Sequence, residues 1–144
     1  ETVYKDIAFG PKNMGLDEAE IDRRVRTAMR RVALDYDKLA QRSAFELSGG
    51  QMQRLAVVVS DICGKELLVF DEPTSGLDLK SMEEVGILTR SLAMQGKVLL
   101  IITHDIEFMM RICTRILFIR DGEIVKDLSG GQKEKIVRLL RGEE

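Results

Sequence analysis

The sequence contains few cysteines, prolines and histidines and no tryptophan. Its 144 residues include 2 cysteines, 2 prolines, 1 histidine and no tryptophan. Cys63 and Cys113 lie far apart without metal-ligand spacing, so we expect buried free thiols in a reducing compartment rather than a disulfide framework. No apolar run approaches the roughly 18 residues of a membrane-spanning helix. The first residues lack a basic-then-apolar signal pattern. We therefore expect any membrane link to be made through a partner protein.

A strong excess of positive charge is also missing. The chain has 22 Lys and Arg against 24 Asp and Glu, a net charge of −2, so we expect no nucleic-acid partner. An apolar content of 44% with 32% charged residues is ordinary for a globular protein. The length is sufficient for one core. These properties predict a single globular domain.

We expect residues 1–16 to be turn-rich, because Phe9-Gly10-Pro11 interrupts any regular element there. After residue 16, strand-like and helix-like segments alternate along the chain. Asp17 with Glu20 resembles a capping box and predicts that a helix begins there. Alternation of this kind predicts an α/β fold. The apolar patterns predict helices over 51–62, 79–94, 105–113 and 133–141, strands over 66–70 and 98–102 that are buried on both faces of a parallel sheet, and a hairpin of 116–119 with 123–125 around Asp121-Gly122.

The helix that begins near Asp17 has a basic face. A charge run of this kind is usually a solvated helix face, and the alternative is a docking surface for an acidic partner. The sequence favours the first interpretation and leaves the second open. The residues concerned are Arg23, Arg24, Arg26, Arg30 and Arg31.

Two carboxylates follow the predicted strand 66–70, within Leu67-Leu68-Val69-Phe70-Asp71-Glu72-Pro73-Thr74-Ser75-Gly76-Leu77-Asp78. In open α/β sheets ligands gather at the carboxyl ends of strands. Adjacent side chains along a strand point in different directions, so Asp71 and Glu72 can take different chemical roles. The dipeptide alone would be better explained as a solvated pair. The residues from Pro73 to Asp78 make a functional site the better interpretation.

A glycine-rich turn opens the predicted helix 51–62, in Leu47-Ser48-Gly49-Gly50-Gln51-Met52-Gln53-Arg54. A helix N-terminus offers unpaired N–H groups and a positive dipole end, which suit an anionic phosphate. The two glycines let the backbone approach a phosphate closely, and the Ser48 hydroxyl adds a donor. The alternative is a plain serine cap followed by glycines. A second Leu-Ser-Gly-Gly-Gln, at 128–132, lacks a following strand that ends in Asp-Glu; we expect a loop that caps the last helix, with a duplicate phosphate site as the unsupported alternative.

Together, Leu47–Arg54 and Leu67–Asp78 resemble the signature and the Walker B and D-loop segments of ATP-binding cassette (ABC) ATPases, the motors of ABC transporters. The stretch Asp6–Leu16 is similar to cassettes of energy-coupling-factor and cobalt/nickel importers. The resemblance covers about Thr2 to Val125. It implies an α/β, partial P-loop NTPase fold with a parallel sheet core flanked by helices. In one domain over 1–144, it places a helical subdomain at about 12–50 and a core with the Walker B and switch-histidine segments at about 51–144.

The resemblance also implies a role for each motif residue. Asp71 would hold Mg²⁺ through the ion's water shell, because Mg²⁺ dehydrates reluctantly. Glu72 would be the general base that polarises the attacking water. His104, which follows the strand 98–102, matches the switch histidine that contacts the γ-phosphate by a ring hydrogen bond. The remaining implied contacts are those of Ser48, Gly49, Gly50 and Gln51 with the γ-phosphate of ATP held by an opposing subunit, and that of Asp78 with a paired subunit.

One segment of the family is absent from the sequence. The phosphate-gripping Walker A pattern G-x-x-x-x-G-K-[ST] does not occur, since Gly64-Lys65 and Gly96-Lys97 have Val59 and Ser91 in place of the earlier glycine. In the family fold, the Walker A strand lies between the strand before His104 and the one near 116–119. We therefore expect a gap with unpaired edges in the sheet, and a chain that is a fragment, a split gene product or an assembly completed by a Walker A-bearing segment.

Three functional interpretations remain open. The first is the ATP-binding and ATP-hydrolysing subunit of an ABC importer, with ATP and Mg²⁺ as cofactors, inactive alone. It would pair with a second ATPase subunit and a transmembrane subunit on the cytoplasmic face of the membrane. The second is the C-terminal lobe of a split chromosome-maintenance or DNA-repair ABC ATPase, although residues 1–46 show no sustained heptads. The third is a non-catalytic partner that supplies the signature in trans.

Overall fold

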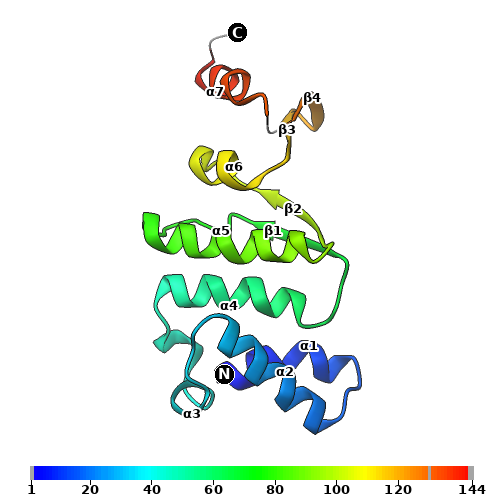
Figure 1. The fold of residues 1–144 in the computed structure, drawn as a ribbon, viewed down its shortest axis with the longest axis vertical. Helices are drawn as coiled ribbons and strands as arrows, with labels where there is room; N and C mark the ends of the chain where they lie inside the picture. Colours follow the sequence, from blue (N-terminus) through cyan, green and yellow to red (C-terminus); the bar gives the residue numbers. More distant parts are fainter. Residues whose placement is uncertain (1, 130, 143–144) are drawn as a thin grey trace. The chain divides into compact units, whose positions relative to one another are not determined.

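The computed structural model describes residues 2–129 and 131–142, and the chain divides into two units, Glu1–Ile102 and Thr103–Glu144 (Figure 1). The first unit contains α1 (Val3–Asn13), α2 (Glu18–Arg31), α3 (Tyr36–Leu39), the short 3₁₀-helix η1 (Ala44–Glu46), α4 (Gly49–Asp61), β1 (Leu67–Asp71), α5 (Leu79–Met94) and β2 (Val98–Ile102). The second contains α6 (Ile106–Ile112), β3 (Arg115–Arg120), β4 (Glu123–Ser129) and α7 (Lys133–Arg141). None of the helices in the described part of the chain is long and apolar enough to cross a membrane.

Residues 3–13 form the helix α1, so the expectation of a turn-rich start was wrong. The Thr2 side chain caps the helix by accepting from the Lys5 N–H at 3.3 Å. Pro11 lies in the last turn, where a missing N–H removes only one intrahelical bond. Gly10 allows close packing, since a Cβ there would stand 2.5 Å from Cys63 Sγ. The buried side of the helix consists of Val3, Ile7, Ala8 and Pro11.

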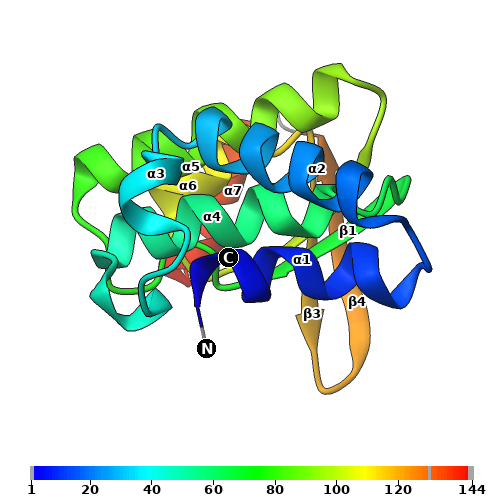
Figure 2. The same ribbon diagram turned by 90° about the horizontal axis from the view of Figure 1, so that it is seen from below.

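The helix α2 begins where its capping signal predicted. Asp17 Oδ1 accepts from the Glu20 N–H at 2.9 Å. The apolar side chains at helical spacing are all buried, and they form a core with residues from α1 and α4. The three helices lie beside one another (Figure 2). This part of the core holds Ile21, Val25, Ala28, Met29 and Val32.

Most arginines on the outer face of α2 are neutralised within the chain. Short ion pairs of 2.7–2.9 Å join Arg23 and Arg24 to Glu20, Arg26 to Asp22, and Arg31 to Asp61. A face whose charges are already paired offers less attraction to an acidic partner. The geometry therefore supports the interpretation of a solvated helix face.

The strands β1 and β2 pair in parallel, with Leu67 opposite Val98 and Asp71 opposite Ile102. Their bounds agree with the predicted strands to within one residue. Burial alternates along β1, where Leu68 is buried and Val69 is 54% exposed. The prediction of burial on both faces is therefore wrong for the described residues, because only one side of this pair is covered. The helices α4 and α5 run beside each other and beside these strands (Figure 1).

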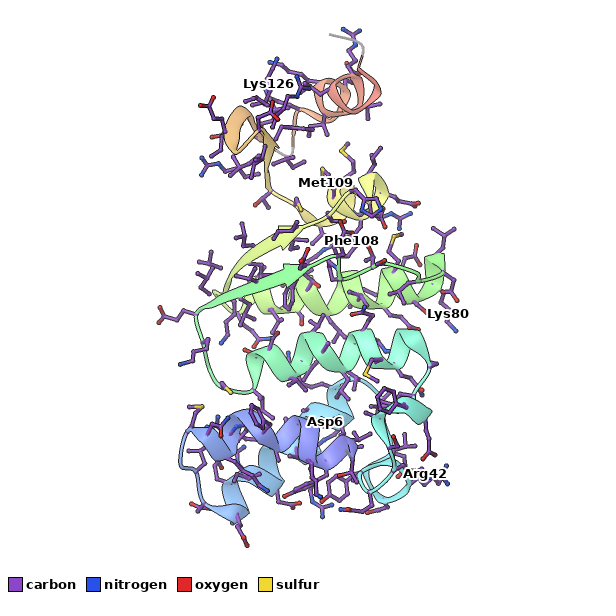
Figure 3. The ribbon with its side chains drawn as sticks, turned by 180° about the vertical axis from the view of Figure 1, so that it is seen from behind. Asp6, Arg42, Lys80, Phe108, Met109 and Lys126 are labelled. Carbon is purple, nitrogen blue, oxygen red and sulfur yellow. The ribbon has the colours of Figure 1, made fainter. Side chains whose placement is uncertain are left out.

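In the second unit, β3 and β4 form the predicted antiparallel hairpin. Asp121 and Gly122 have φ values of +51° and +82°, as a two-residue turn of type I′ requires. Strand β4 extends to Ser129, further than predicted. Phe108 and Met109 (labelled in Figure 3) are buried side chains of α6. A small core joins the hairpin to its helices through Met109, Ile116, Leu128 and Ile136.

The second Leu-Ser-Gly-Gly-Gln differs in part from the expected capping loop. Leu128 and Ser129 belong to β4, while Gly130 lies outside the described residues. Gln132 is the N-cap of α7 and makes no side-chain cap hydrogen bond. Its Oε1 atom instead accepts from the Ser129 N–H at 3.2 Å. The strand takes the first residues because Leu128 is a core side chain of the hairpin.

Candidate functional site

The predicted signature turn forms the first turn of α4. Ser48 is the N-cap: its Oγ accepts from the Gln51 N–H at 3.3 Å, and Gln51 Oε1 accepts from the Ser48 N–H at 2.9 Å. This reciprocal pair is a capping box, for which Ser-x-x-Gln was a signal that our sequence analysis did not use. The first backbone bond of the helix runs from the Met52 N–H to Ser48 O at 2.9 Å. The N–H groups of Gly49 and Gly50 therefore have no intrahelical acceptor and could bind an anion.

The two glycines of this turn have different surroundings. A Cβ on Gly49 would meet only Leu77 Cδ2, at 3.9 Å, so the space above Gly49 is open. A Cβ on Gly50 would stand 2.6 Å from Ser81 Oγ and 3.0 Å from Ser81 Cβ. Close packing against α5 therefore explains why position 50 is a glycine, whereas at position 49 a glycine would leave room for a ligand.

Asp78, the predicted D-loop residue, is the N-cap of α5. Its Oδ1 accepts from the Ser81 N–H at 2.7 Å. The backbone hydrogen bond from Ser81, followed by one from the Ser81 side chain, holds the pKa of Asp78 below its usual value. Asp78 therefore has a structural task in its own chain, and a contact with a paired subunit stays a prediction.

The predicted Walker B carboxylates stand at the end of β1. Asp71 is the last strand residue and is exposed. Glu72 turns the chain with a φ of +48°, a region that non-glycine residues adopt rarely. Its N–H donates to Ile102 O at 2.8 Å, and its Oε2 atom is buried. The two side chains therefore meet different environments, which suits different chemical roles.

The turn that follows Glu72 connects the carboxylates to Asp78. The Ser75 N–H donates to Glu72 O at 3.1 Å, and the Leu77 N–H donates to Thr74 O at 3.1 Å. Gly76 has a φ of +72°, which glycine adopts without strain. These bonds hold the segment as an ordered turn on unit 1.

The structure brings the predicted residues of unit 1 into two groups. In the first group, Gly50 lies against Ser81 in the first turn of α5, which Asp78 caps, and Gly49 lies near Leu77, just before that cap. Asp71 and Glu72 form the second group, beside Ile102 at the carboxyl ends of the strands. His104 is exposed and belongs to the second unit, two residues after the end of β2.

The carboxylate of Asp71 at the end of β1 is the kind of ligand that Mg²⁺ uses when it binds beside nucleotides. In the described ranges, no group of three or more His, Cys, Asp and Glu side chains could hold a metal by itself. Mg²⁺ in phosphoryl-transfer sites needs only one or two carboxylates, with water and substrate phosphate as the other ligands. The exposed Asp71 can serve as such a ligand.

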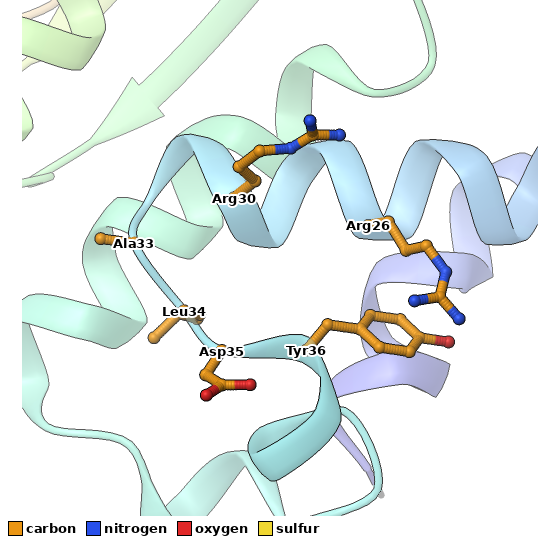
Figure 4. A pocket seen from close by; sticks show the side chains of 6 residues that line it. All are labelled: Arg26, Arg30, Ala33, Leu34, Asp35 and Tyr36. Carbon is orange, nitrogen blue, oxygen red and sulfur yellow. The ribbon is translucent and has the colours of Figure 1, made fainter.

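A pocket of about 500 Å³ lies elsewhere in unit 1 (Figure 4). The Arg26 guanidinium stacks on the Tyr36 ring at 3.8 Å from its centroid, and the Tyr36 hydroxyl donates to Asp22 at 2.6 Å. That hydrogen bond, with burial, raises the pKa of Tyr36 to about 12. None of the predicted site residues lines the pocket, whose walls are Arg26, Arg30, Ala33, Leu34, Asp35 and Tyr36.

Sequence reasoning missed the residues that connect α4 to α5. Ser81 packs on Gly50, and Arg54 forms an ion pair with Glu84. Arg54 was visible as the last residue of the signature match. Its partner depends on which helix lies alongside, and no local pattern shows that.

Comparison with known proteins agrees with this arrangement. The "ABC transporter" family profile matches residues 1–75. The "Energy-coupling factor transporter ATP-binding protein EcfA2" of Clostridium tetani is 41% identical over 128 residues, which cover 88% of this chain and 44% of that protein. The chain spans about half or less of the length of the curated relatives that it matches, for example 26% of one and 47% of another.

Solved structures show the same fold. The structure of cbiO1 from Clostridium perfringens, described as part of the ABC transporter complex cbiONQ, has a TM-score of 0.78 and 30% identity over 97% of this chain and 55% of that one. The ATP-binding cassette MJ0796, in a dimeric post-hydrolysis state bound to ADP and Pi, has a TM-score of 0.73 and 25% identity over 89% and 56%. The fold is therefore that of ABC ATPases, which are P-loop NTPases, and the chain belongs to the ABC transporter family.

Proposed function

We propose that the chain works as the signature and Walker B part of the ATP-hydrolysing subunit of an ABC importer. The observation that carries the proposal is the start of α4, where the capped turn leaves the N–H groups of Gly49 and Gly50 without an intrahelical acceptor and the space above Gly49 open. Phosphoryl transfer needs positioned donors and carboxylates rather than covalent chemistry by the protein. The two groups of residues in unit 1 supply both.

Each side chain has a task that its surroundings allow. Glu72, with its buried Oε2 atom, would orient the attacking water and accept its proton. Asp71 would bind the water shell of Mg²⁺, which neutralises phosphate charge when bound. His104 would donate a ring hydrogen bond to the γ-phosphate. Ser48 can donate its hydroxyl hydrogen while its Oγ still accepts from Gln51.

The signature residues and the carboxylates would act on different nucleotides. Ser48, Gly49, Gly50 and Gln51 would contact ATP held by a second ATPase subunit, as the dimeric MJ0796 structure with ADP and Pi supports. The printed names of the EcfA2 and cbiO1 relatives, a transporter ATP-binding protein and a part of a transporter complex, support work beside other transporter subunits. In the proposal the partner is a transmembrane subunit of an importer, and the chain lies on the cytoplasmic face of the membrane. Because the sequence contains no Walker A loop, a Walker A-bearing segment or chain would hold the phosphates beside Glu72.

The short helices disfavour the chromosome-maintenance alternative. In the described part of residues 1–46, the longest helix is α2, with 14 residues. A coiled-coil arm would need heptads sustained over several turns. An importer cassette with a helical subdomain agrees better with α1, α2 and α3 packed on one core.

Calorimetry and hydrolysis assays test the proposal together. Mg²⁺-ATP is titrated into the purified chain, alone and mixed with a Walker A-bearing N-terminal half of a related cassette. We expect no binding alone and hydrolysis in the mixture, with a loss of about 10²-fold or more in Glu72→Gln. Tight binding to the chain alone would contradict the missing phosphate grip. Hydrolysis that Glu72→Gln leaves unchanged, or that needs only Ser48 of this chain, would favour a non-catalytic partner instead.

A further inference from the structure

We propose that Arg54 and Glu84 are positioning residues that lock the signature turn to the D-loop cap, with Ser81 against Gly50 as the second point of contact. The two helices then carry Ser48 and Asp78 as one rigid body. The inference rests on the proposed function for its role in hydrolysis, while the lock itself is a property of unit 1. Neither charged residue has a part in the chemistry of the site described above.

The lock consists of two contacts about one helical turn apart. On α4, Gly50 and Arg54 are four residues apart and share one face, since Arg54 Nη1 is 3.6 Å from the Cβ position of Gly50. On α5, Ser81 and Glu84 are three residues apart and share the facing side. Gly50 meets Ser81, and Arg54 pairs with Glu84. One contact would fix only a separation, whereas two in register also oppose sliding of α4 along α5.

The position of the ion pair follows the two caps. Ser48 caps α4 and Asp78 caps α5, and Arg54 and Glu84 each stand six residues after the cap of their own helix. The ion pair therefore joins the two helices at the same number of residues after Ser48 and after Asp78. It holds the starts of both helices in register, where an error would move Ser48 relative to Asp78.

The arginine of this pair is more buried than the paired arginines of α2. The Arg54 side chain is 18% exposed, against 27–66% for the four paired arginines of α2, while Glu84 is 37% exposed. A partly buried guanidinium–carboxylate hydrogen bond is stronger and less screened by salt than an exposed one. The two helices have buried apolar side chains of their own, which are Leu55, Val57, Val58, Met82, Val85 and Leu92. The ion pair therefore adds a directional contact between helices whose apolar faces are already buried.

A double-mutant cycle on the whole chain tests the lock by amide hydrogen exchange. Asp78→Ala removes the cap of α5, and the readout is exchange of the Met52 N–H, the first amide of α4 with a backbone acceptor. We expect about threefold faster exchange or more in the otherwise wild-type chain, and no such increase in an Arg54→Met background. The exchanged pair Arg54→Glu with Glu84→Arg restores the coupling. Arg26→Met, which loses an ion pair within α2, serves as the control that leaves it intact.

Equal effects of Asp78→Ala in both backgrounds, or none on Met52, would overturn the lock. In the hydrolysing mixture, we expect Arg54→Met to lower kcat about tenfold while KM stays within about twofold, and the exchanged pair to recover kcat. A raised KM at unchanged kcat would overturn the positioning role. If the wild-type mixture hydrolyses nothing, the proposed function and the positioning role both fail, while the exchange cycle still decides whether the lock exists.

Discussion

The same five residues, Leu-Ser-Gly-Gly-Gln, occur at 47–51 and at 128–132 in two different settings. In the first, Ser48 caps α4 with both halves of a capping box. In the second, Ser129 ends β4 and α7 has no side-chain cap. One half of the box is common to both, since each glutamine Oε1 accepts from the serine N–H. The local sequence is therefore sufficient for the glutamine contact and insufficient for the cap.

Neighbouring elements explain the difference between the copies. Leu47 is half-buried against the helical core, whereas Leu128 is a buried side chain in the core of the hairpin. Gly50 packs on Ser81, whereas a Cβ on Gly131 would meet nothing within 4 Å. A phosphate-binding turn needs an exposed, fixed helix N-terminus, and of these two glycines only Gly50 packs against a side chain of a second helix. The predictions below compare the copies, from the largest expected effect to the smallest.

Alanine at the second glycine of the first copy should destabilise the protein most. In Gly50→Ala the new Cβ would clash with Ser81, so α4 and α5 must separate, at a cost of about 1–3 kcal/mol. Gly131→Ala should change stability by less than about 0.5 kcal/mol, since its Cβ enters open space. Urea unfolding followed by tyrosine fluorescence measures Gly50→Ala, because both tyrosines, Tyr4 and Tyr36, lie in unit 1, and circular dichroism of the whole chain measures Gly131→Ala in unit 2. A recovery of stability in Gly50→Ala with Ser81→Gly would confirm the cause, and equal stability of the two alanine variants would contradict it.

The helices that follow the two copies also end differently. The end of α4 carries a paired carboxylate, so we expect the stability of unit 1 to depend on pH. The last residue of α4, Asp61, pairs with Lys97 at 2.8 Å and with Arg31 at 2.9 Å, whereas α7 ends at Gly142 with a φ of +69°. Burial raises the pKa of Asp61, but the hydrogen bonds from Lys97 and Arg31 outweigh it and hold the pKa below its usual value. The stabilisation of the folded state by the ionised Asp61 is therefore fully present above the unfolded pKa of about 3.9, and it is lost as the pH falls through the lower folded pKa.

We expect Asp61→Asn to cost unit 1 about 1–2 kcal/mol at pH 7, and the difference from wild type to be lost as the pH falls through the lowered pKa of Asp61. Urea unfolding at a series of pH values measures it through the same tyrosines. A matched control is Asp127→Asn, which removes an exposed pair with Arg115 in unit 2 and should leave the unit 1 transition unchanged. A deficit that persists unchanged at low pH would show that the Asp61 charge is not its cause.

Replacing the serine of each copy should give smaller losses of stability, and the loss should be larger for the first copy. Ser48→Ala removes the acceptor for the Gln51 N–H and should cost about 1 kcal/mol. Ser129→Ala should cost less than about 0.5 kcal/mol, because the Ser129 hydroxyl caps no helix. Urea unfolding of unit 1 and circular dichroism of the whole chain measure the two variants. Equal losses would mean that the copies share a cap after all.

Predictions from the sequence were correct where they depended on residues close together along the chain. The α2 start at Asp17, the strand Val98–Ile102 and the turn at Asp121-Gly122 depend on local caps, runs and backbone preferences, and the structure confirms them. The helix α1 was missed because Gly10-Pro11 reads as a breaker, although Gly10 is there to admit Cys63.

The candidate site shows the same limit. Its residue types and order follow from the motif, and the structure places Asp71 and Glu72 at a strand end as expected. The packing of Gly50 on Ser81 and the pair of Arg54 with Glu84 could not be predicted, because each depends on which helices become neighbours. The structure explains Gly50 by a tertiary contact where the sequence suggested only a ligand.

The smallest effect on stability should come from the first glycine of the first copy. Gly49→Ala places a Cβ in open space, 3.9 Å from Leu77 Cδ2, so we expect a change of less than about 0.5 kcal/mol in unit 1. The same methyl group would stand where a phosphate must approach the N–H groups of α4. Hydrolysis in the Walker A-supplemented mixture should therefore fall about tenfold or more although the fold is intact. Gly50→Ala cannot separate these effects, because it disturbs packing as well. A Gly49→Ala variant with full stability and full hydrolysis would mean that the first copy is only a helix cap.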